Sequence, residues 1–276
     1  MNTKKRDKIA GAIYGFAIGD AMGATTEFAT ATEVKIIYGK VTDIIGGGWL
    51  NLKPGEVTDD TQMTMCIMSA LMNTLDKNDP LGFIFLKQLR KEFIDWYESN
   101  PKDIGCQCQK AIQEMIYFKK LGASKNENAL GNGSLMRAMP CAILDKFKLN
   151  ELQGRMTHNN EECTRIIKMY SKLIQNHLNS KYIDENVKCL TEPFGNVRST
   201  FNNSVYWSQK DSFEEAIIGA VNHGGDADTI AAITGSIAGA KFGYNAIPKI
   251  WIEKLSPDVK KILKKFKNFT FSYLQI

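Results

Sequence analysis

Paired cysteines, prolines and repeats are scarce or absent in this sequence of 276 residues. None of its 6 cysteines belongs to a CxxC pair, and Cys106 and Cys108 are too close together for the usual zinc spacing. Scattered cysteines of this kind are typical of a reducing cytoplasm, so we expect a cytoplasmic protein. Only 7 prolines occur, and neither a repeat nor a low-complexity linker interrupts the chain. We therefore expect a single domain over residues 1–276, a length ample for a full core.

The sequence also lacks a hydrophobic run long enough to cross a membrane. The run "IAGAIYGFAIG" follows "KKR" near the N-terminus and resembles the start of a signal peptide. Asp7 and Asp20 bracket it, however, and the helical pattern continues without a convincing cleavage site. At eleven residues it is far too short to span a bilayer. We expect neither a leader nor a membrane partner.

Charge gives no strong sign of a nucleic-acid partner either. The net charge of +5 comes mostly from scattered lysines. One local excess, residues 258–269 ("DVKKILKKFKNF"), could form a basic amphipathic helix for nucleic acid or membrane, or a solvated face of an ordinary helix. Ile262, Leu263 and Phe266 give this segment a core-facing side, which favours the ordinary helix. We expect no nucleic-acid partner and a monomeric protein.

Helical periodicity dominates what is present. Residues 9–18 place their apolar side chains on one helical face, while Gly11, Gly15 and Gly19 form a flat stripe that would let another helix approach closely. Helices are also predicted over residues 61–75, 81–98, 161–178, 212–225 and 229–243, the fourth with a capping box of Ser212 and Glu215. Only residues 34–44 show strand-like alternation, and residues 179–193 are the most loop-like stretch. The sequence predicts an all-α fold.

Two acidic clusters precede two of the predicted helices. A single Asp at a helix start can serve only as an N-cap. Here each cluster has more carboxylates than a cap needs, carries hydroxyl groups beside them, and leads into a helix too apolar to accommodate stray charge. The members are Thr58, Asp59 and Asp60 in the first cluster, and Asp226, Asp228 and Thr229 in the second.

Four carboxylates brought together from these clusters would repel one another unless cations lay between them. Oxygen ligands without His or Cys favour Mg²⁺, Mn²⁺ or Ca²⁺ over zinc, and two such ions would balance four negative charges. Glu27, just past the end of the first helix, is a further candidate ligand or acid. Spacing alone does not establish that the two clusters meet.

The sequence resembles the ADP-ribosylglycohydrolase family, which includes dinitrogenase-reductase-activating glycohydrolases and ADP-ribosyl-acceptor hydrolases. The resemblance rests on five blocks in family order, from about residue 7 to 243: "GAIYGFAIGDAMGATTEF", "GGGWLNLKPGEVTDDTQM", "GNGSLMRAMP", "RMTHNN" and "AVNHGGDADTIAAITGSIAGAKFG". It implies a compact helical domain with a binuclear Mg²⁺ or Mn²⁺ centre at the base of an ADP-ribose cleft.

The resemblance also implies roles for individual residues. Thr58, Asp59 and Asp60 match one half of the metal site. Asp226, Asp228 and Thr229 match the other half, and Asp228 would bridge the two ions. Glu27 matches an acid beside the metals in parts of the family, although its neighbours Thr25 and Thr26 depart from the Pro-containing version common there.

Ligand-binding residues are implied in the same way. The segment "GNGSLMR" (131–137) resembles a loop that wraps the ribose and diphosphate, with Asn132, Gly133 and Ser134 as contacts, and its alternative reading is a plain turn. His158 matches a histidine near the distal ribose, although such a histidine is more often structural. Gly224 and Gly225 are assigned to the ligand as well, and His223 has no assigned role. Replacing Asn132 or Ser134 should then weaken ADP-ribose binding and leave the metals bound.

The implied reaction is hydrolysis of the bond between C1″ of ADP-ribose and a protein side chain, with arginine as the expected acceptor. Asp59 or Asp60 would orient the attacking water or act as general base, and a nearby acid would assist the leaving group. Serine-linked, polymeric or small-molecule conjugates are alternative substrates. Two other readings are a non-catalytic ADP-ribose binder and a phosphohydrolase, since "DADT" is similar to a nucleophile motif that follows a buried strand.

Overall fold

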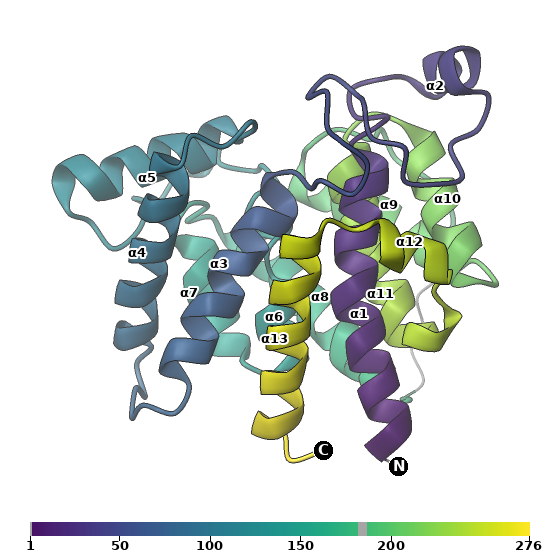
Figure 1. Ribbon diagram of the computed structural model, residues 1–276. Coiled ribbons are helices and arrows are strands. Elements are labelled where there is room, and N and C mark those ends of the chain that lie inside the picture. The colour runs from purple at the N-terminus through teal and green to yellow at the C-terminus, as the bar shows by residue number, and fades with distance from the viewer. Residues whose placement is uncertain (1, 182–186) are drawn as a thin grey trace.

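The computed structural model describes residues 2–181 and 187–276, and this part of the chain is built from helices. Within it are thirteen α-helices and one short 3₁₀ helix, and β-pairing is confined to isolated bridges. Figure 1 shows the arrangement. The helices are α1 (Asn2–Gly23), α2 (Ala31–Tyr38), α3 (Asp59–Thr74), α4 (Phe83–Glu98), α5 (Cys106–Phe118), α6 (Met139–Ile143), α7 (Phe147–Arg155), α8 (Glu161–Leu178), α9 (Val197–Ser208), α10 (Phe213–His223), α11 (Ala227–Phe242), η1 (Tyr244–Ala246), α12 (Lys249–Lys254) and α13 (Pro257–Tyr273).

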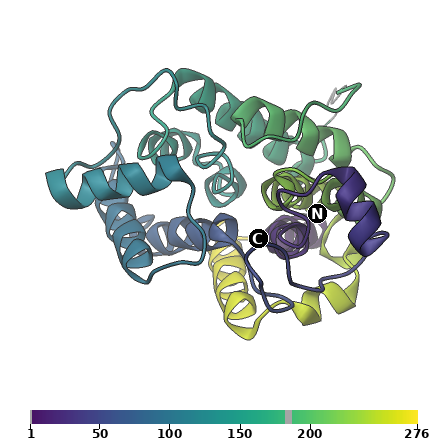
Figure 2. The same cartoon turned by 90° about the horizontal axis from the view of Figure 1, so that it is seen from above.

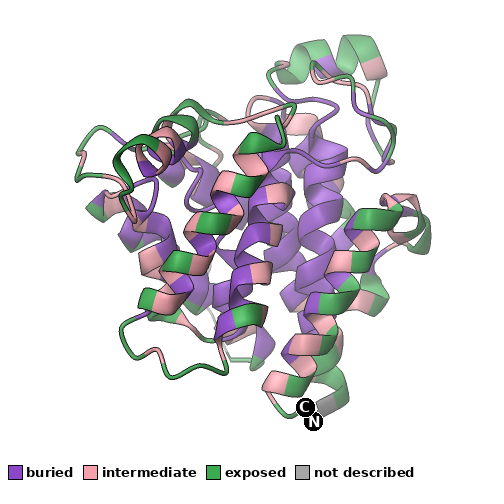
Figure 3. Ribbon diagram, turned by 60° about the vertical axis from the view of Figure 1, so that its left-hand side comes forward, coloured by how far each residue is buried: buried purple, intermediate pink, exposed green. Residues whose placement is uncertain are grey.

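Helices α1 and α11 form the closely packed centre of the molecule. Figure 2 views the purple α1 nearly end-on, with other helices around it, and Figure 3 shows the central helices buried. The predicted glycine stripe makes this pairing possible. A Cβ on Gly15 would overlap the carbonyl oxygen of Gly235, and one on Gly11 would overlap that of Gly239. The expectation that the stripe admits a second helix closely is confirmed, and the partner is α11.

The predicted helices are present with small shifts of their ends. Residues 161–178 match α8, and the predicted segments 61–75, 81–98, 212–225 and 229–243 correspond to α3, α4, α10 and α11. Ser212 caps α10 by accepting a hydrogen bond from the backbone N–H of Glu215. Gly243, with φ of 92°, ends α11 in a conformation that favours glycine. The all-α prediction is confirmed.

The strand-like segment 34–44 is not a strand. Its first residues belong to α2, which a complete capping box of Thr30 and Glu33 starts. Only Val34 of this helix is buried, whereas Ile36 and Ile37 are exposed. Local capping therefore outweighed the alternation of apolar residues, because no strand in the described part of the chain offers backbone hydrogen bonds to this segment.

The basic segment 258–269 lies in α13, which packs on the core through Val259, Leu263 and Phe266. This agrees with an ordinary helix whose lysines face solvent. Residues 179–181 and 187–193 contain no helix, and the middle of that predicted loop, residues 182–186, lies outside the described part. Among the described helices, none combines the length and hydropathy that crossing a bilayer would require.

Candidate metal centre and ligand cleft

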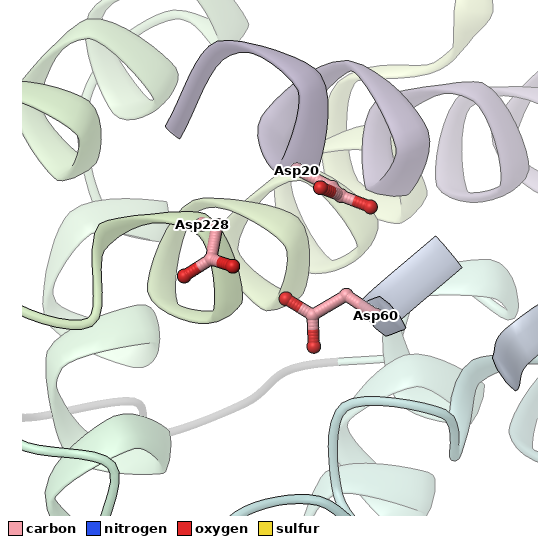
Figure 4. Close-up of side chains that lie close together, drawn as sticks. All are labelled: Asp20, Asp60 and Asp228. Atoms are coloured by element: carbon pink, nitrogen blue, oxygen red, sulfur yellow. The ribbon is translucent and has the colours of Figure 1, made fainter. Parts of the chain in front are cut away.

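Three carboxylates from three different helices meet where α1 ends and where α3 and α11 begin. Asp20 comes from α1, Asp60 from α3 and Asp228 from α11, as Figure 4 shows. One oxygen atom of each lies within 4.8 Å of the others, and all three side chains are buried. The two acidic clusters of the sequence, separated by 168 positions between Asp60 and Asp228, are therefore brought together by the fold.

The N-cap explanation does not account for these acids. Thr58 is the N-cap of α3, and its hydroxyl accepts a hydrogen bond from the N–H of Asp60 at 3.3 Å. Asp226 occupies the N-cap position of α11, yet its side chain makes no capping hydrogen bond. Asp60 Oδ2 and Asp228 Oδ1 are buried without a hydrogen-bond partner. Buried carboxylate oxygens without partners require another source of compensation, which a bound cation or a bound proton can supply.

Asp20 was not among the site residues predicted from the sequence. Both of its oxygens accept backbone hydrogen bonds at the start of α3, from the N–H of Thr58 and of Thr61, each at 3.0 Å. It therefore fixes the start of α3 and faces the acidic cluster at the same time. The available signal was one acid within the buried face of an apolar helix, where a stray charge is costly.

A second group of acids adjoins the first and shares Asp228 with it. Oxygens of Glu27, Asp226 and Asp228 lie within 4.8 Å of one another. The indole N–H of Trp49 donates to Glu27 Oε2 at 2.7 Å, and the Asn132 amide donates to Asp226 Oδ2 at 2.6 Å. Glu27 and Asp226 are therefore oriented by neutral donors, which leave the negative charge of the two carboxylates uncompensated.

Burial and mutual repulsion raise the pKa values of these acids. The pKa of Asp60 and of Asp228 is raised well above the ordinary range, first by burial and then by neighbouring carboxylates. Burial raises the pKa of Glu27 to about 8. In the described ranges, no lysine or arginine forms an ion pair with any acid of the two groups. The arrangement fits divalent cations, whose charge would replace the bound protons.

Thr229 completes the contact between the two sequence clusters. Its hydroxyl donates to Asp60 Oδ1 at 3.3 Å and is buried. Thr58 is buried too, with its hydroxyl engaged in the cap. Their assignment as metal ligands therefore stays a prediction, but both hydroxyls lie beside acids of the cluster.

Glu27, Asp226 and Asp228 line a cleft of about 260 Å³, whereas Asp20 and Asp60 are not among its lining residues. Asp59 also lines this cleft, and its Oδ2 accepts the N–H of Gly105 at 3.3 Å. Asp103 lines the same cleft and interacts with Asp59, and burial together with this neighbour raises the pKa of Asp59 to about 8. Asp103, in the "KDIG" segment before α5, is a second acid that the sequence reading missed. Its surroundings contain no cluster that would have revealed it.

The glycine-rich loop lines the same cleft and contacts the acids through the bond from Asn132 to Asp226. Gly131, Asn132 and Gly133 line the cleft together with His158. A Cβ on Gly133 would lie 2.8 Å from His158 Cε1, so glycine allows the loop to rest on the imidazole ring. Burial lowers the pKa of His158 to about 3, and the ring is therefore neutral near pH 7. Ser134, by contrast, is fully buried and does not line the cleft.

A buried arginine holds the loop to the segment that carries His158. Arg137 donates to the carbonyl oxygen of Gly133 at 2.9 Å and to Thr157 Oγ1 at 2.7 Å. Thr157 Oγ1 lies 2.8 Å from Nδ1 of His158. A single fully buried side chain therefore links these two parts of the cleft lining.

Gly224 and Gly225 join the end of α10 to the start of α11. Both have positive φ, 75° and 67°. The N–H of Gly225 donates to the carbonyl oxygen of Ala29, and its own carbonyl accepts from the N–H of Phe28, both at 2.7 Å. These glycines position Glu27 and Asp226 relative to each other, and their predicted contact with ligand stays a prediction.

Comparison with known proteins matches this chain to a family. The family model described as "ADP-ribosylglycohydrolase" covers residues 1–270. The chain belongs to the ADP-ribosylglycohydrolase family. The family resemblance of the sequence is thereby confirmed, and the chain is a hydrolase of this family.

Two curated relatives and one solved structure illustrate the match. The chain is 33% identical to the "ADP-ribosyl-[dinitrogen reductase] glycohydrolase" of Rhodospirillum rubrum, over 94% of each protein. It is 31% identical to the "ADP-ribosylarginine hydrolase Tri1" of Serratia proteamaculans (strain 568), over 90% of this chain and 75% of the relative. A solved structure titled "ADP-ribosylglycohydrolase-related protein complex" superposes with a TM-score of 0.81 at 24% identity, covering 99% of each chain, and supports the fold.

The phosphohydrolase reading loses its structural basis. Its motif requires a buried strand before the first acid, whereas helix α10 ends at His223, just before "GGDADT". An ADP-ribosylglycohydrolase with two adjoining acid groups beside a cleft agrees with all of these observations.

Proposed function

We propose that this ADP-ribosylglycohydrolase removes ADP-ribose from modified arginine side chains and requires two divalent cations, Mg²⁺ or Mn²⁺. The observation that carries the proposal is the pair of acid groups that share Asp228 at the wall of the cleft. Arginine is favoured over serine-linked, polymeric and small-molecule conjugates because a relative with 31% identity is named as an ADP-ribosylarginine hydrolase.

The residues present fit two cations. Asp60 and Asp228, with Asp20 and the hydroxyls of Thr58 and Thr229 nearby, would hold one ion. Asp226 and Glu27 would hold the other together with Asp228, which both groups contain. When bound, such cations neutralise the carboxylates and polarise the oxygen atoms they contact. Oxygen ligands alone point to hard cations and not to zinc.

The chain's own residues would bind and orient the substrate. The N–H groups of Gly131 and Gly133, two loop residues that line the cleft, would serve as anion-binding donors, whereas the Asn132 N–H is already bonded to the carbonyl oxygen of Gly195 at 3.0 Å. Neutral His158 lies beside both glycines. The ribose whose C1″ carries the modified side chain would then lie against the acids that line the cleft. This holds the reacting carbon beside Asp59, which lines the same cleft.

Hydrolysis forms a bond from a water oxygen to C1″ and breaks the bond from C1″ to the guanidino nitrogen. Asp59 would take the proton from the attacking water, and its neighbour Asp103 would share that proton. The leaving group departs as a neutral guanidine, because the guanidinium of the substrate keeps the electron pair of the broken bond. It then takes up the proton that the water lost. Asp60 and Glu27, also predicted to act catalytically, would orient the site and assist departure.

The test uses proteins modified separately on Arg, Ser or Glu, incubated with enzyme that has been chelated, dialysed and then supplied with Mg²⁺, Mn²⁺ or buffer. Release of ADP-ribose from the arginine conjugate alone, and only with metal, is expected. Full activity of the metal-stripped enzyme would refute the cation requirement, and release from serine but not arginine would refute the acceptor. Tight binding of ADP-ribose without turnover of any conjugate would identify a non-catalytic binder.

A further inference from the structure

A second cavity, of about 500 Å³, adjoins the cleft beside the acids. The two spaces share Phe28, Gly195 and Asp226, so the cavity continues the cleft past Asp226. Its walls are residues 28–31, residues 192–195 and the turn between α10 and α11. A ligand whose reacting carbon lay at the acid groups could extend directly into this space.

Backbone hydrogen bonds fix the walls of the cavity to one another. The N–H of Asp226 donates to the carbonyl oxygen of Pro193 at 2.8 Å, while Gly225 is bonded to both Phe28 and Ala29. Phe28 has φ of 63°, a left-handed conformation that a bulky residue seldom adopts. Strained backbone of this kind is retained mainly at functional sites. The cavity is therefore a built feature of the fold.

The walls combine aromatic faces with negative charge. Phe28 and Phe194 both line the cavity and are 68% and 66% exposed, although leaving two large apolar residues in water is unfavourable. Glu192 and Asp226 supply carboxylates, and no lysine or arginine is among the described lining residues. In the described part of the chain the Glu192 carboxylate has no ion-pair partner.

We propose that this cavity binds the guanidinium group and side chain of the modified arginine, with Phe28 and Phe194 as stacking faces and Glu192 as the charge partner. A planar cation stacks on aromatic rings and pairs with carboxylates in a way that a serine hydroxyl does not. This inference rests on the proposed function and adds to it the residues that select the acceptor.

The same chemistry argues against the adenine end of the ligand as the occupant. Adenine would stack on the phenylalanines, but it would bring the diphosphate close to Glu192 and Asp226, where like charges repel. The diphosphate has a better place in the cleft at Gly131 and Gly133, beside His158 and away from Glu192, which lines only the second cavity. We therefore assign the diphosphate to the cleft and the acceptor side chain to the adjoining cavity.

The experiment compares the Mg²⁺-loaded variants Glu192→Gln and Phe194→Leu with wild type on two conjugates. One is ADP-ribosylagmatine, whose leaving group is a guanidine, and the other carries 4-nitrophenol at C1″. The matched control is Glu214→Gln, which removes the same charge from an exposed residue in the first turn of α10. We expect kcat/KM for ADP-ribosylagmatine to fall about tenfold in Glu192→Gln, a loss of about 1.4 kcal/mol. Turnover of the nitrophenyl conjugate and the Kd of free ADP-ribose should stay within twofold.

Equal losses on both conjugates, or no loss on either, would overturn the inference. A weaker Kd for ADP-ribose with unchanged preference between conjugates would assign the cavity to the adenine end. An NMR titration of agmatine into wild type and into Glu192→Gln measures the affinity of the cavity for a guanidinium ligand without turnover. Binding of agmatine that depends on Glu192, in an enzyme that cleaves neither conjugate, would contradict the proposed function and leave the cavity assignment standing.

Discussion

The substitution Asp228→Asn examines the metal centre most directly. Asp228 is 2% exposed and belongs to both acid groups, so its carboxylate faces the other four acids. Asparagine has nearly the same size, and packing should barely change. The variant therefore removes one negative charge and weakens one oxygen ligand at the point where the two proposed ions would meet.

Without metal, the variant should be as stable as wild type at low pH and more stable at high pH. Burial, followed by the Glu27 charge, raises the pKa of Asp228 well above its ordinary range. The folded wild type therefore holds a proton that the unfolded chain releases above about pH 4, and its stability falls as pH rises from there towards the raised pKa. Asparagine has no such proton. The free energy of unfolding of the variant should therefore exceed that of wild type by a difference that grows by at most about 1.4 kcal/mol per pH unit across that window.

With metal, the order should reverse. At a Mg²⁺ concentration about 100 times Kd, binding stabilises the folded wild type by about 2.7 kcal/mol, and a hundredfold loss of affinity leaves about 0.4 kcal/mol. For a chain of this size the wild-type melting temperature should rise by roughly 5 to 10 °C on adding Mg²⁺, and that of the variant by about 1 °C. Turnover should fall by orders of magnitude, because both orientation and charge compensation are lost.

Thermal melts with and without Mg²⁺ at several pH values, beside one turnover assay, measure all of these effects. Asp258→Asn is the control, since Asp258 lies in the first turn of α13 and is exposed. Its loss should change stability by less than about 1 kcal/mol, with or without metal. Near-normal turnover of Asp228→Asn, with an Mg²⁺ response equal to that of wild type, would refute the metal assignment.

Three further substitutions test neighbouring parts of the structure. Asn132→Ala should weaken Mg²⁺ binding as well as ADP-ribose binding, because the amide donates a hydrogen bond of 2.6 Å to Asp226. Calorimetric titration with each ligand measures both affinities. Unchanged metal affinity would support the expectation from sequence that only ADP-ribose binding depends on Asn132. Trp49→Phe removes the N–H bonded to Glu27 and should weaken metal binding about threefold to tenfold, whereas Trp207→Phe removes an N–H that has no partner and should not. Gly235→Ala would drive a Cβ into the backbone of α1 and should cost about 1–3 kcal/mol in urea unfolding, whereas Gly105→Ala, with open space around it, should be nearly neutral.

Local patterns were sufficient for the long central helices and for most of the acids. Periodicity placed α8 at its observed bounds, and the glycine stripe of α1 predicted a close helix partner. Thr58, Asp59 and Asp60 stand at a helix start as predicted, and so do Asp226, Asp228 and Thr229. Each of these features depends on residues that lie within a few positions of one another, so sequence spacing is enough to predict it. Segment 34–44 was predicted wrongly, because a capping box favoured a helix over an apparent strand. Five further helices, α5, α6, α7, α9 and α12, were not predicted.

Only the tertiary structure decided which acids meet. Asp20 joins the cluster because α1 packs on α11 and crosses the start of α3, and no local pattern links positions 20, 60 and 228. Asp103, Trp49 and the cavity beside Asp226 depend in the same way on loops brought together from distant parts of the chain. Sequence neighbours determine helix ends through hydrogen bonds of a few residues' reach, whereas the electrostatics of a site depends on distances through space, which the packing of whole helices sets.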